Sequence, residues 1–318
     1  MVSFVKLKNK KYSLIVVIGL ILCEFAFSRV SASEDIWLID THSSPWHSAS
    51  EQGFERAIYY QLVDNKWVKS DLTTFLETQA PEIPLVIFSP GYTSTMSDTV
   101  EVGMSLVRLY QKDQKCRTVF WCWPADKIRL RLGPDIREKI SVAEASAGYL
   151  RLFLSRLKPE SKVCLLGFSF GNRIICDAVQ KLGDECPENM RFHLVLTAAA
   201  TDRVWLAECS RHGDVPRLAD KIFVSYNPAD RALIFYPHLY GNCSQPDALG
   251  RFGPPMQLIA PEYHDRIEAV NVNPYVGSYH RTIHHLQTPV FRQRMNDYLF
   301  FAADDTATDD PTSVATTE

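Results

Sequence analysis

The stretch from residue 163 to residue 174 constrains the fold of this chain more than any other. It reads Val-Cys-Leu-Leu-Gly-Phe-Ser-Phe-Gly-Asn-Arg-Ile, which is an apolar run, a G-x-S-x-G motif and the start of a helical pattern. Gly167 and Gly171 allow the sharp turn that would hold Ser169 above a sheet, between a buried strand and a helix. Because the motif has this setting, it predicts a nucleophilic serine. The alternative is a tight structural turn.

Short strand-like runs alternate with longer helical patterns along the chain. This alternation predicts an α/β fold, with a mostly parallel central sheet, helices on both faces and the first two strands as an antiparallel edge. No repeat or linker-like stretch interrupts residues 33–302, so we expect one domain there. The predicted strands are 36–40, 56–62, 85–89, 118–123, 163–167, 193–197, 221–226 and 267–271, and the predicted helices are 97–114, 142–157, 172–182, 202–211 and 289–301.

A serine nucleophile needs a base, and the base needs an orienting carboxylate. In α/β-hydrolases these follow in the order serine, acid, histidine. Asp230 lies in the loop after the predicted strand 221–226 and is our candidate acid. Asp202 is the alternative acid, but its place favours a helix N-cap.

The base is expected in the loop 272–287, which contains His280, His284 and His285. We choose His284 because it lies close to the helix start at Thr288, where a capping hydroxyl precedes a proline. His280 is the next candidate, and the residues alone leave all three open. His264 precedes the last strand and is disfavoured.

An oxyanion hole should use two backbone amides. The first is that of Phe170, the residue after the nucleophile. The second should come from the loop after strand 85–89, where Pro90 and Gly91 precede Tyr92. The Tyr92 amide is therefore the candidate, and an ordinary Pro-Gly turn is the alternative.

These residues together resemble an uncharacterised α/β-hydrolase family with HGY, WPS and HSMGNR motifs. The matching stretches are Pro90-Gly91-Tyr92, Trp123-Pro124-Ala125 and Gly167 to Arg173, and the similarity continues through 194–199 and 224–233 to cover about 84–300. The resemblance implies an α/β-hydrolase fold and a Ser–Asp–His site, with no known substrate. Two departures stand out: Pro90 replaces the family's histidine, and the family's catalytic histidine falls between the positions of His280 and His284.

The two ends of the chain differ from its body. Four lysines precede the apolar run 13–23, and small residues follow at 30–32, so residues 1–32 predict a signal peptide and export. An uncleaved membrane anchor is the alternative. The acidic segment 303–318 predicts a disordered tail.

Cleavage of the signal would remove Cys23 and leave seven of the eight cysteines, so at least one thiol stays outside an internal disulfide. Cys122, Cys164 and Cys176 are expected to be buried. Any pairing among the others (Cys116, Cys186, Cys209 and Cys243) stays open.

The composition excludes some partners. The chain has 34 basic and 37 acidic residues, so it lacks the excess of positive charge that is typical of a nucleic-acid-binding protein. No cysteine or histidine cluster has the spacing of a metal site, so we expect no metal and no organic cofactor. Basic and apolar residues alternate at the start of segment 126–141, which predicts either a cap over an acidic or lipid-like substrate or a solvated surface.

The sequence therefore predicts an exported serine hydrolase that cleaves small or lipid-like esters through Ser169, His284 and Asp230. The second hypothesis is a catalytically silent protein that keeps this fold for binding or as a scaffold. Pro90 and the choice among three histidines support that second hypothesis.

Overall fold

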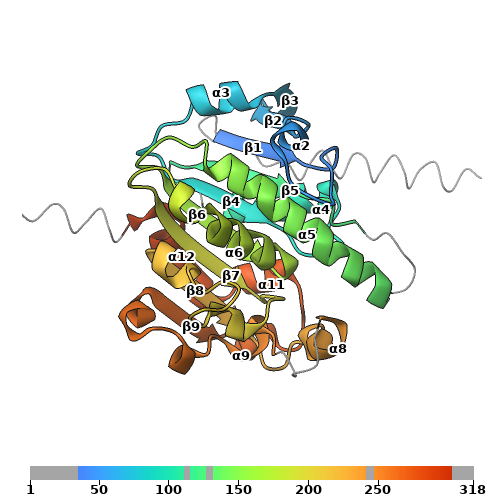
Figure 1. Cartoon of the computed structure of the whole chain (residues 1–318), viewed down its shortest axis with the longest axis vertical. Helices are drawn as coiled ribbons and strands as arrows, with labels where there is room; N and C mark the ends of the chain where they lie inside the picture. Colours follow the sequence, from blue (N-terminus) through green and yellow to red (C-terminus); the bar gives the residue numbers. More distant parts are fainter. Residues whose placement is uncertain (1–34, 111–114, 127–131, 241–246, 303–318) are drawn as a thin grey trace, which may run out of the picture. The chain divides into compact units, whose positions relative to one another are not determined.

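A nine-stranded sheet organises the described residues of the computed structural model, which are 35–110, 115–126, 132–240 and 247–302 (Figure 1). The strand order is β3-β2-β1-β5-β4-β6-β7-β8-β9. All neighbouring pairs from β1 to β9 are parallel, whereas β2 is antiparallel to β1 and to β3. The strands are β1 (Asp35–Asp40), β2 (Ile58–Val63), β3 (Lys66–Ser70), β4 (Leu85–Ser89), β5 (Arg117–Cys122), β6 (Lys162–Phe168), β7 (Arg191–Thr197), β8 (Lys221–Tyr226) and β9 (Ile267–Asn271).

The predicted mostly parallel sheet is confirmed, together with an antiparallel edge. The central strands β4 and β5 are buried along their whole length, as expected for strands that helices cover on both faces. The edge strand β3 was missed by the sequence prediction because it is short, polar and largely exposed. It follows a hairpin turn in which Asp64 and Asn65 both have positive φ, 49° and 61°.

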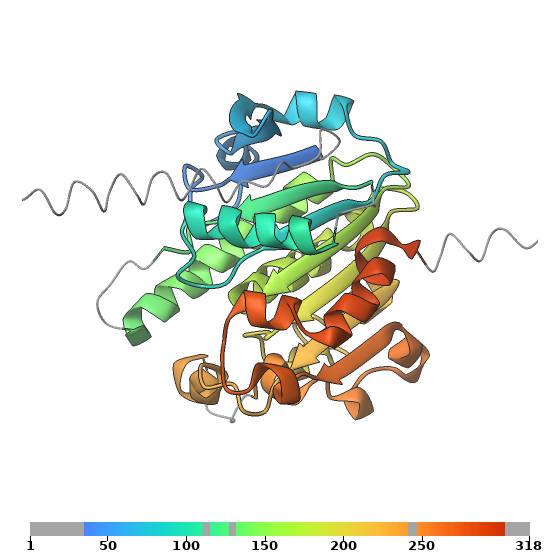
Figure 2. The ribbon, with the colours of Figure 1, turned by 180° about the vertical axis from the view of Figure 1, so that it is seen from behind.

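Helices cover both faces of the sheet. The long helices α5 and α6 pack against each other on the face seen in Figure 1. The opposite face carries α4, α11 and α12 (Figure 2). The helices are α2 (Glu51–Phe54), α3 (Leu72–Glu77), α4 (Met96–Tyr110), α5 (Leu132–Leu154), α6 (Phe170–Leu182), α7 (Val215–Leu218), α8 (Tyr236–Tyr240), α9 (Leu249–Phe252), α10 (Asn273–Val276), α11 (Thr282–Leu286) and α12 (Pro289–Phe300).

Two helix predictions need correction. The predicted helix 202–211 is only a 3-10 turn, Arg203–Leu206, which Asp202 caps by accepting from the Val204 amide. Helix α5 begins at Leu132 rather than at residue 142. The described part of the predicted cap therefore belongs largely to α5, and Lys139 is buried there and donates to the Pro124 carbonyl. The start of α12 is as predicted, since the Thr288 hydroxyl accepts from the Phe291 amide.

The ends of the chain lie outside the described residues, so the predicted signal peptide and tail stay predictions. No described helix combines the length and the apolar character needed to cross a membrane. Cys122, Cys164 and Cys176 are buried as predicted, and none of the six described cysteines forms a disulfide.

Candidate active site

Ser169 occupies a strained turn between β6 and α6. Its φ and ψ are 53° and −114°, a region that a residue with a side chain rarely adopts. The turn is held by its own backbone: the Ser169 amide donates to the Thr197 carbonyl (3.0 Å), and the Ser169 carbonyl accepts from the amides of Asn172 (3.2 Å) and Ala200 (3.1 Å). The Asn172 side chain adds a hydrogen bond to the Thr197 carbonyl (2.8 Å). The predicted elbow is thus present at Ser169.

The glycines around Ser169 permit close backbone approach. A Cβ atom at Gly171 would overlap the carbonyl of Ser89 at the end of β4. A Cβ atom at Gly167 would lie 2.6 Å from the Asn172 side-chain oxygen. Any larger residue would therefore separate α6 from the sheet and move the serine.

A continuous line of hydrogen bonds joins Ser169, His280 and Asp230. His280 Nε2 lies 2.9 Å from Ser169 Oγ, and His280 Nδ1 lies 2.7 Å from Asp230 Oδ2. Asp230 is fully buried, and its other oxygen accepts from the amides of Ala232 (2.9 Å) and Leu233 (3.0 Å). These two amides fix the carboxylate, so that it can orient the imidazole.

The structure corrects the choice of histidine. His284 lies on α11, where its ring packs edge-on against Tyr279 with centroids 5.1 Å apart, whereas His280 makes the hydrogen bonds to Ser169 and Asp230. His285 is buried, its Nδ1 lies 3.2 Å from Ser225 Oγ, and burial lowers its pKa to about 4. The error arose because residues 282–286 form their own short helix, where the sequence pattern predicts a continuous loop.

A cavity of about 760 Å³ opens at Ser169. Its described lining is mostly apolar, and the charged groups among these residues are two carboxylates on α4 and one arginine. The lining residues are Tyr92, Thr93, Ser94, Asp98, Glu101, Val102, Ile136, Phe168, Ser169, Phe170, Ala200, Ala232, Leu233, Phe235, His280, Arg281, Thr282 and Ile283. The cavity gives a ligand access to both Ser169 and His280.

Both predicted oxyanion residues line this cavity. Gly91 brings the loop after β4 close to the elbow, since a Cβ atom there would lie 3.1 Å from Ser169 Cβ. The Tyr92 ring packs against Phe170 with centroids 5.9 Å apart, and its hydroxyl donates to Asp135 on α5. Burial and this hydrogen bond raise the pKa of Tyr92. The loop that carries the Tyr92 amide is therefore tied to α5.

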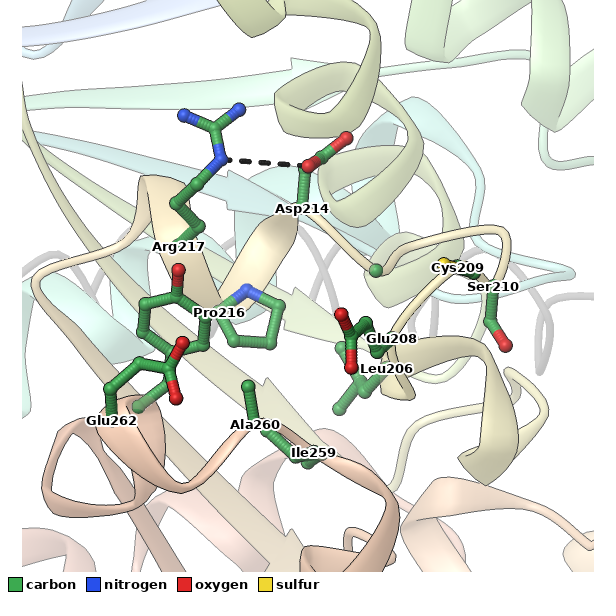
Figure 3. Close-up of a pocket in the computed structure, with 12 residues that line it drawn as sticks. Leu206, Glu208, Cys209, Ser210, Asp214, Pro216, Arg217, Ile259, Ala260 and Glu262 are labelled. Atoms are coloured by element: carbon green, nitrogen blue, oxygen red, sulfur yellow. Dashed lines mark ion pairs between the residues drawn. The ribbon is translucent and has the colours of Figure 1, made fainter.

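A second cavity, of about 440 Å³, has a different lining (Figure 3). It lies among the 3-10 turn Arg203–Leu206, α7 and the 3-10 helix Pro261–Arg266. Asp214 and Arg217 form an ion pair at its edge, 3.5 Å apart. Ser169, His280 and Asp230 take no part in its lining, so this cavity is separate from the candidate active site.

The sheet order, the elbow and the acid after β8 define an α/β-hydrolase fold. The chain belongs to the family described as alpha/beta hydrolase of unknown function (DUF900), whose model matches residues 64–288. A search of curated proteins finds no match.

Solved structures of similar fold include several esterases. One is an esterase of Pyrobaculum calidifontis, with 14% sequence identity over 93% of this chain and 92% of that chain, and a TM-score of 0.43. Another is the inhibited esterase B of Lactobacillus rhamnosis, with 12% identity over 94% and 97% and a TM-score of 0.37. A bacterial heroin esterase matches with 11% identity over 90% and 88% and a TM-score of 0.38.

Proposed function

We propose that the protein is a serine hydrolase of carboxylic ester-type bonds. The observation that carries the proposal is the line of hydrogen bonds from Ser169 Oγ through His280 to the buried carboxylate of Asp230. In this arrangement Ser169 is the nucleophile, His280 the general base and Asp230 the group that orients the imidazole. The strained backbone of Ser169 supports the same role, because such strain concentrates at functional sites.

The reaction takes two displacements. Ser169 Oγ attacks the ester carbonyl while His280 Nε2 accepts its proton, and the amides of Phe170 and Tyr92 donate to the oxyanion. His280 then returns the proton to the departing alcohol, which leaves an acyl group on Ser169. A water molecule attacks this acyl-enzyme, again with His280 as base, and the carboxylic acid leaves as Ser169 regains its proton.

The cavity indicates the kind of ester. Apolar side chains such as Val102, Ile283 and Phe235 would contact an acyl chain, and Phe235 is 58% exposed at the cavity. Among the described lining residues, Asp98 and Glu101 outnumber Arg281, and this charge balance disfavours an anionic substrate. A neutral small-molecule or lipid-like ester therefore fits the cavity better than an acidic one.

A fluorophosphonate probe tests the proposal, because it reacts with an activated serine. We expect covalent labelling of the folded protein and complete loss of labelling in Ser169→Ala. Ser94→Ala is the matched control, since Ser94 lines the same cavity and should leave labelling unchanged. His280→Ala should abolish labelling, whereas His284→Ala should retain it. A folded protein that takes up no probe would instead support the catalytically silent binding or scaffold protein.

We also propose that the chain is exported, on the strength of the four lysines and the apolar run 13–23. Expression in the native host followed by cell fractionation and N-terminal sequencing tests this. Mature protein that begins near residue 33 in the exported fraction is the expected result. Protein retained in the membrane fraction with its first residues intact would favour the anchor, and intact protein in the cytosol would contradict export.

A further inference from the structure

Asp40, His42 and Cys122 form a cluster of donor groups that does not include Ser169, His280 or Asp230. Asp40 ends β1 and Cys122 ends β5, and the two residues are directly paired in the parallel ladder. His42 follows two residues after Asp40. One donor atom from each (a carboxylate oxygen, a ring nitrogen and Sγ) lies within 4.8 Å of the other two.

The His42 ring is held from both sides. Its Nδ1 lies 2.6 Å from Asp40 Oδ1, and its Nε2 lies 3.1 Å from Asp126 Oδ2. A histidine that binds a metal through one nitrogen usually donates its other N–H to a carboxylate, which fixes the ring orientation. Asp126 is placed to provide that second carboxylate for His42.

We propose that Asp40, His42 and Cys122 bind a divalent transition-metal ion, with zinc as the best fit. Thiolate, imidazole and carboxylate are all zinc ligands, and three of them leave a fourth position for water. The side chains of Asp40 and Cys122 are buried, whereas 29% of the His42 side chain is exposed. An ion therefore has a path from solvent through the His42 side of the cluster.

Binding an ion requires the ligand atoms of His42 and Asp40 to move apart. Two ligand atoms at about 2.0–2.1 Å from a tetrahedral ion lie roughly 3.3 Å apart. His42 Nδ1 and Asp40 Oδ1 are 2.6 Å apart, so they must separate by under about 1 Å on binding. His42 can make this movement because it follows the strand and is partly exposed.

The competing interpretation is a protonated histidine with no ion. The hydrogen bond to Asp40 raises the pKa of His42 to about 10, so in the ion-free protein the imidazole carries a proton that the ion must displace. The two interpretations differ in whether zinc binds at all and in whether changes at His42 and Asp126 weaken its binding.

The cluster also lies beside the oxyanion loop. Beyond Cys122, the Ala125 carbonyl accepts from the Thr93 amide (2.9 Å), and the Trp123 side chain donates to the Pro90 carbonyl (3.0 Å). An ion bound at the end of β5 would brace residues that hold this loop. Its proposed role is structural, and it takes part in no step of ester hydrolysis.

Metal binding is testable on the full reduced chain after removal of metals with a chelator and dialysis. Isothermal titration with zinc should show one ion bound per chain. Thermal unfolding with and without zinc should show a rise in Tm. Cobalt(II), bound in place of zinc, should produce a thiolate-to-metal charge-transfer band. Cys122→Ser should remove this band, and Asp126→Asn should weaken zinc binding by about 10–100-fold. His42→Gln should weaken binding at least as strongly.

Two variants serve as matched controls. Cys209→Ser removes an exposed thiol and His47→Gln an exposed nearby imidazole, and both should bind zinc as the parent does. If Cys122→Ser fails to fold, His42→Gln and Asp126→Asn decide, because both positions are partly exposed. Absence of a tight site, or zinc affinity unchanged in His42→Gln, would overturn the proposal and favour the protonated histidine. Ser169→Ala should bind zinc normally, so failure of the hydrolase proposal would be seen separately.

Discussion

Two histidines of this protein contact a buried aspartate at the same distance but in different surroundings. His280 lies 2.7 Å from Asp230, and His212 lies 2.7 Å from Asp177. The other nitrogen of His280 reaches Ser169 Oγ at the edge of a cavity. His212 is instead 1% exposed. The two aspartate–histidine pairs are similar, but of the two only the His280–Asp230 pair contacts the proposed nucleophile, Ser169.

The surroundings of the His212 pair explain its different role. Arg211 makes two hydrogen bonds to Asp177 (2.9 and 2.7 Å) and stacks over Trp205, 4.7 Å from its ring centroid. The His212 ring packs edge-on against the same tryptophan, at 5.1 Å. The group joins α6 to the segment after the 3-10 turn Arg203–Leu206. An aspartate–histidine pair therefore indicates catalysis only where the second ring nitrogen reaches a nucleophile that a substrate can approach.

The largest expected difference between the two pairs lies in the histidines. His280→Ala should lower kcat for a chromogenic nitrophenyl ester by roughly 10⁶-fold, because the serine loses its base. Its free energy of unfolding should change little. His212→Ala should keep kcat and lower the free energy of unfolding by about 1–3 kcal/mol, since Asp177 loses a buried donor. Steady-state kinetics and urea unfolding of both variants measure the two effects. Equal losses of kcat in His280→Ala and His212→Ala would contradict different roles for the two pairs.

Changes to the two aspartates should also separate activity from stability, and their effect on kcat should be smaller than that of the histidine changes. Asp230→Asn should lower kcat by roughly 10⁴-fold, because an amide does not stabilise the imidazolium that forms during reaction. Asp177→Asn should leave kcat unchanged and cost about 1.5–3 kcal/mol of stability, since Arg211 and His212 lose a charged hydrogen-bond acceptor. The same two assays apply. An active Asp230→Asn enzyme would remove Asp230 from the proposed mechanism.

The comparison also shows what local sequence can predict. The turn at Ser169 and the position of Asp230 after a strand depend on local strand, turn and helix patterns, so the sequence could predict where both residues lie in the fold. The choice among three histidines in one loop could not, because it depends on whether residues 282–286 form a helix and on which side of it faces the core.

Contacts between distant segments were beyond the reach of the sequence patterns. Asp40, His42 and Cys122 have no recognisable spacing, and they meet only because β1 inserts next to β5 in the sheet. The lengths of the central strands could be predicted from their apolar runs, whereas β3 is too polar to be recognised without its hairpin partner. Sheet order is a tertiary property, and it decides which strand ends become neighbours.

Acid should lower the free energy of unfolding through two buried histidines, His285 and His212. Burial lowers the pKa of His285 to about 4 and also lowers that of His212, so both are neutral in the folded protein. In the unfolded chain they take up a proton near pH 6.5. Stability is therefore fully present above that pH and is lost as the pH falls, for His285 down to about pH 4. That loss amounts to about 3 kcal/mol for His285.

Urea unfolding at pH 7 and at pH 4.5 measures this dependence. His285→Gln should flatten the change in the free energy of unfolding between the two pH values. His284→Gln is the matched control from the neighbouring position and should leave the change as in the parent. An unaltered pH dependence in His285→Gln would show that other groups cause the loss.

The smallest expected effect concerns the loop that brings Tyr92 to the cavity at Ser169. Tyr92→Phe removes the hydroxyl that donates to Asp135 and should cost about 1.5–2 kcal/mol of stability. Because the amide of residue 92 then moves more freely, kcat should fall about tenfold or less, which corresponds to roughly 1.4 kcal/mol. Tyr279→Phe, at an exposed tyrosine, is the control. A double-mutant cycle with Asp135→Ala isolates the hydrogen bond: if the two changes lower kcat additively, the bond does not brace the loop and Tyr92 acts on the site only through its ring.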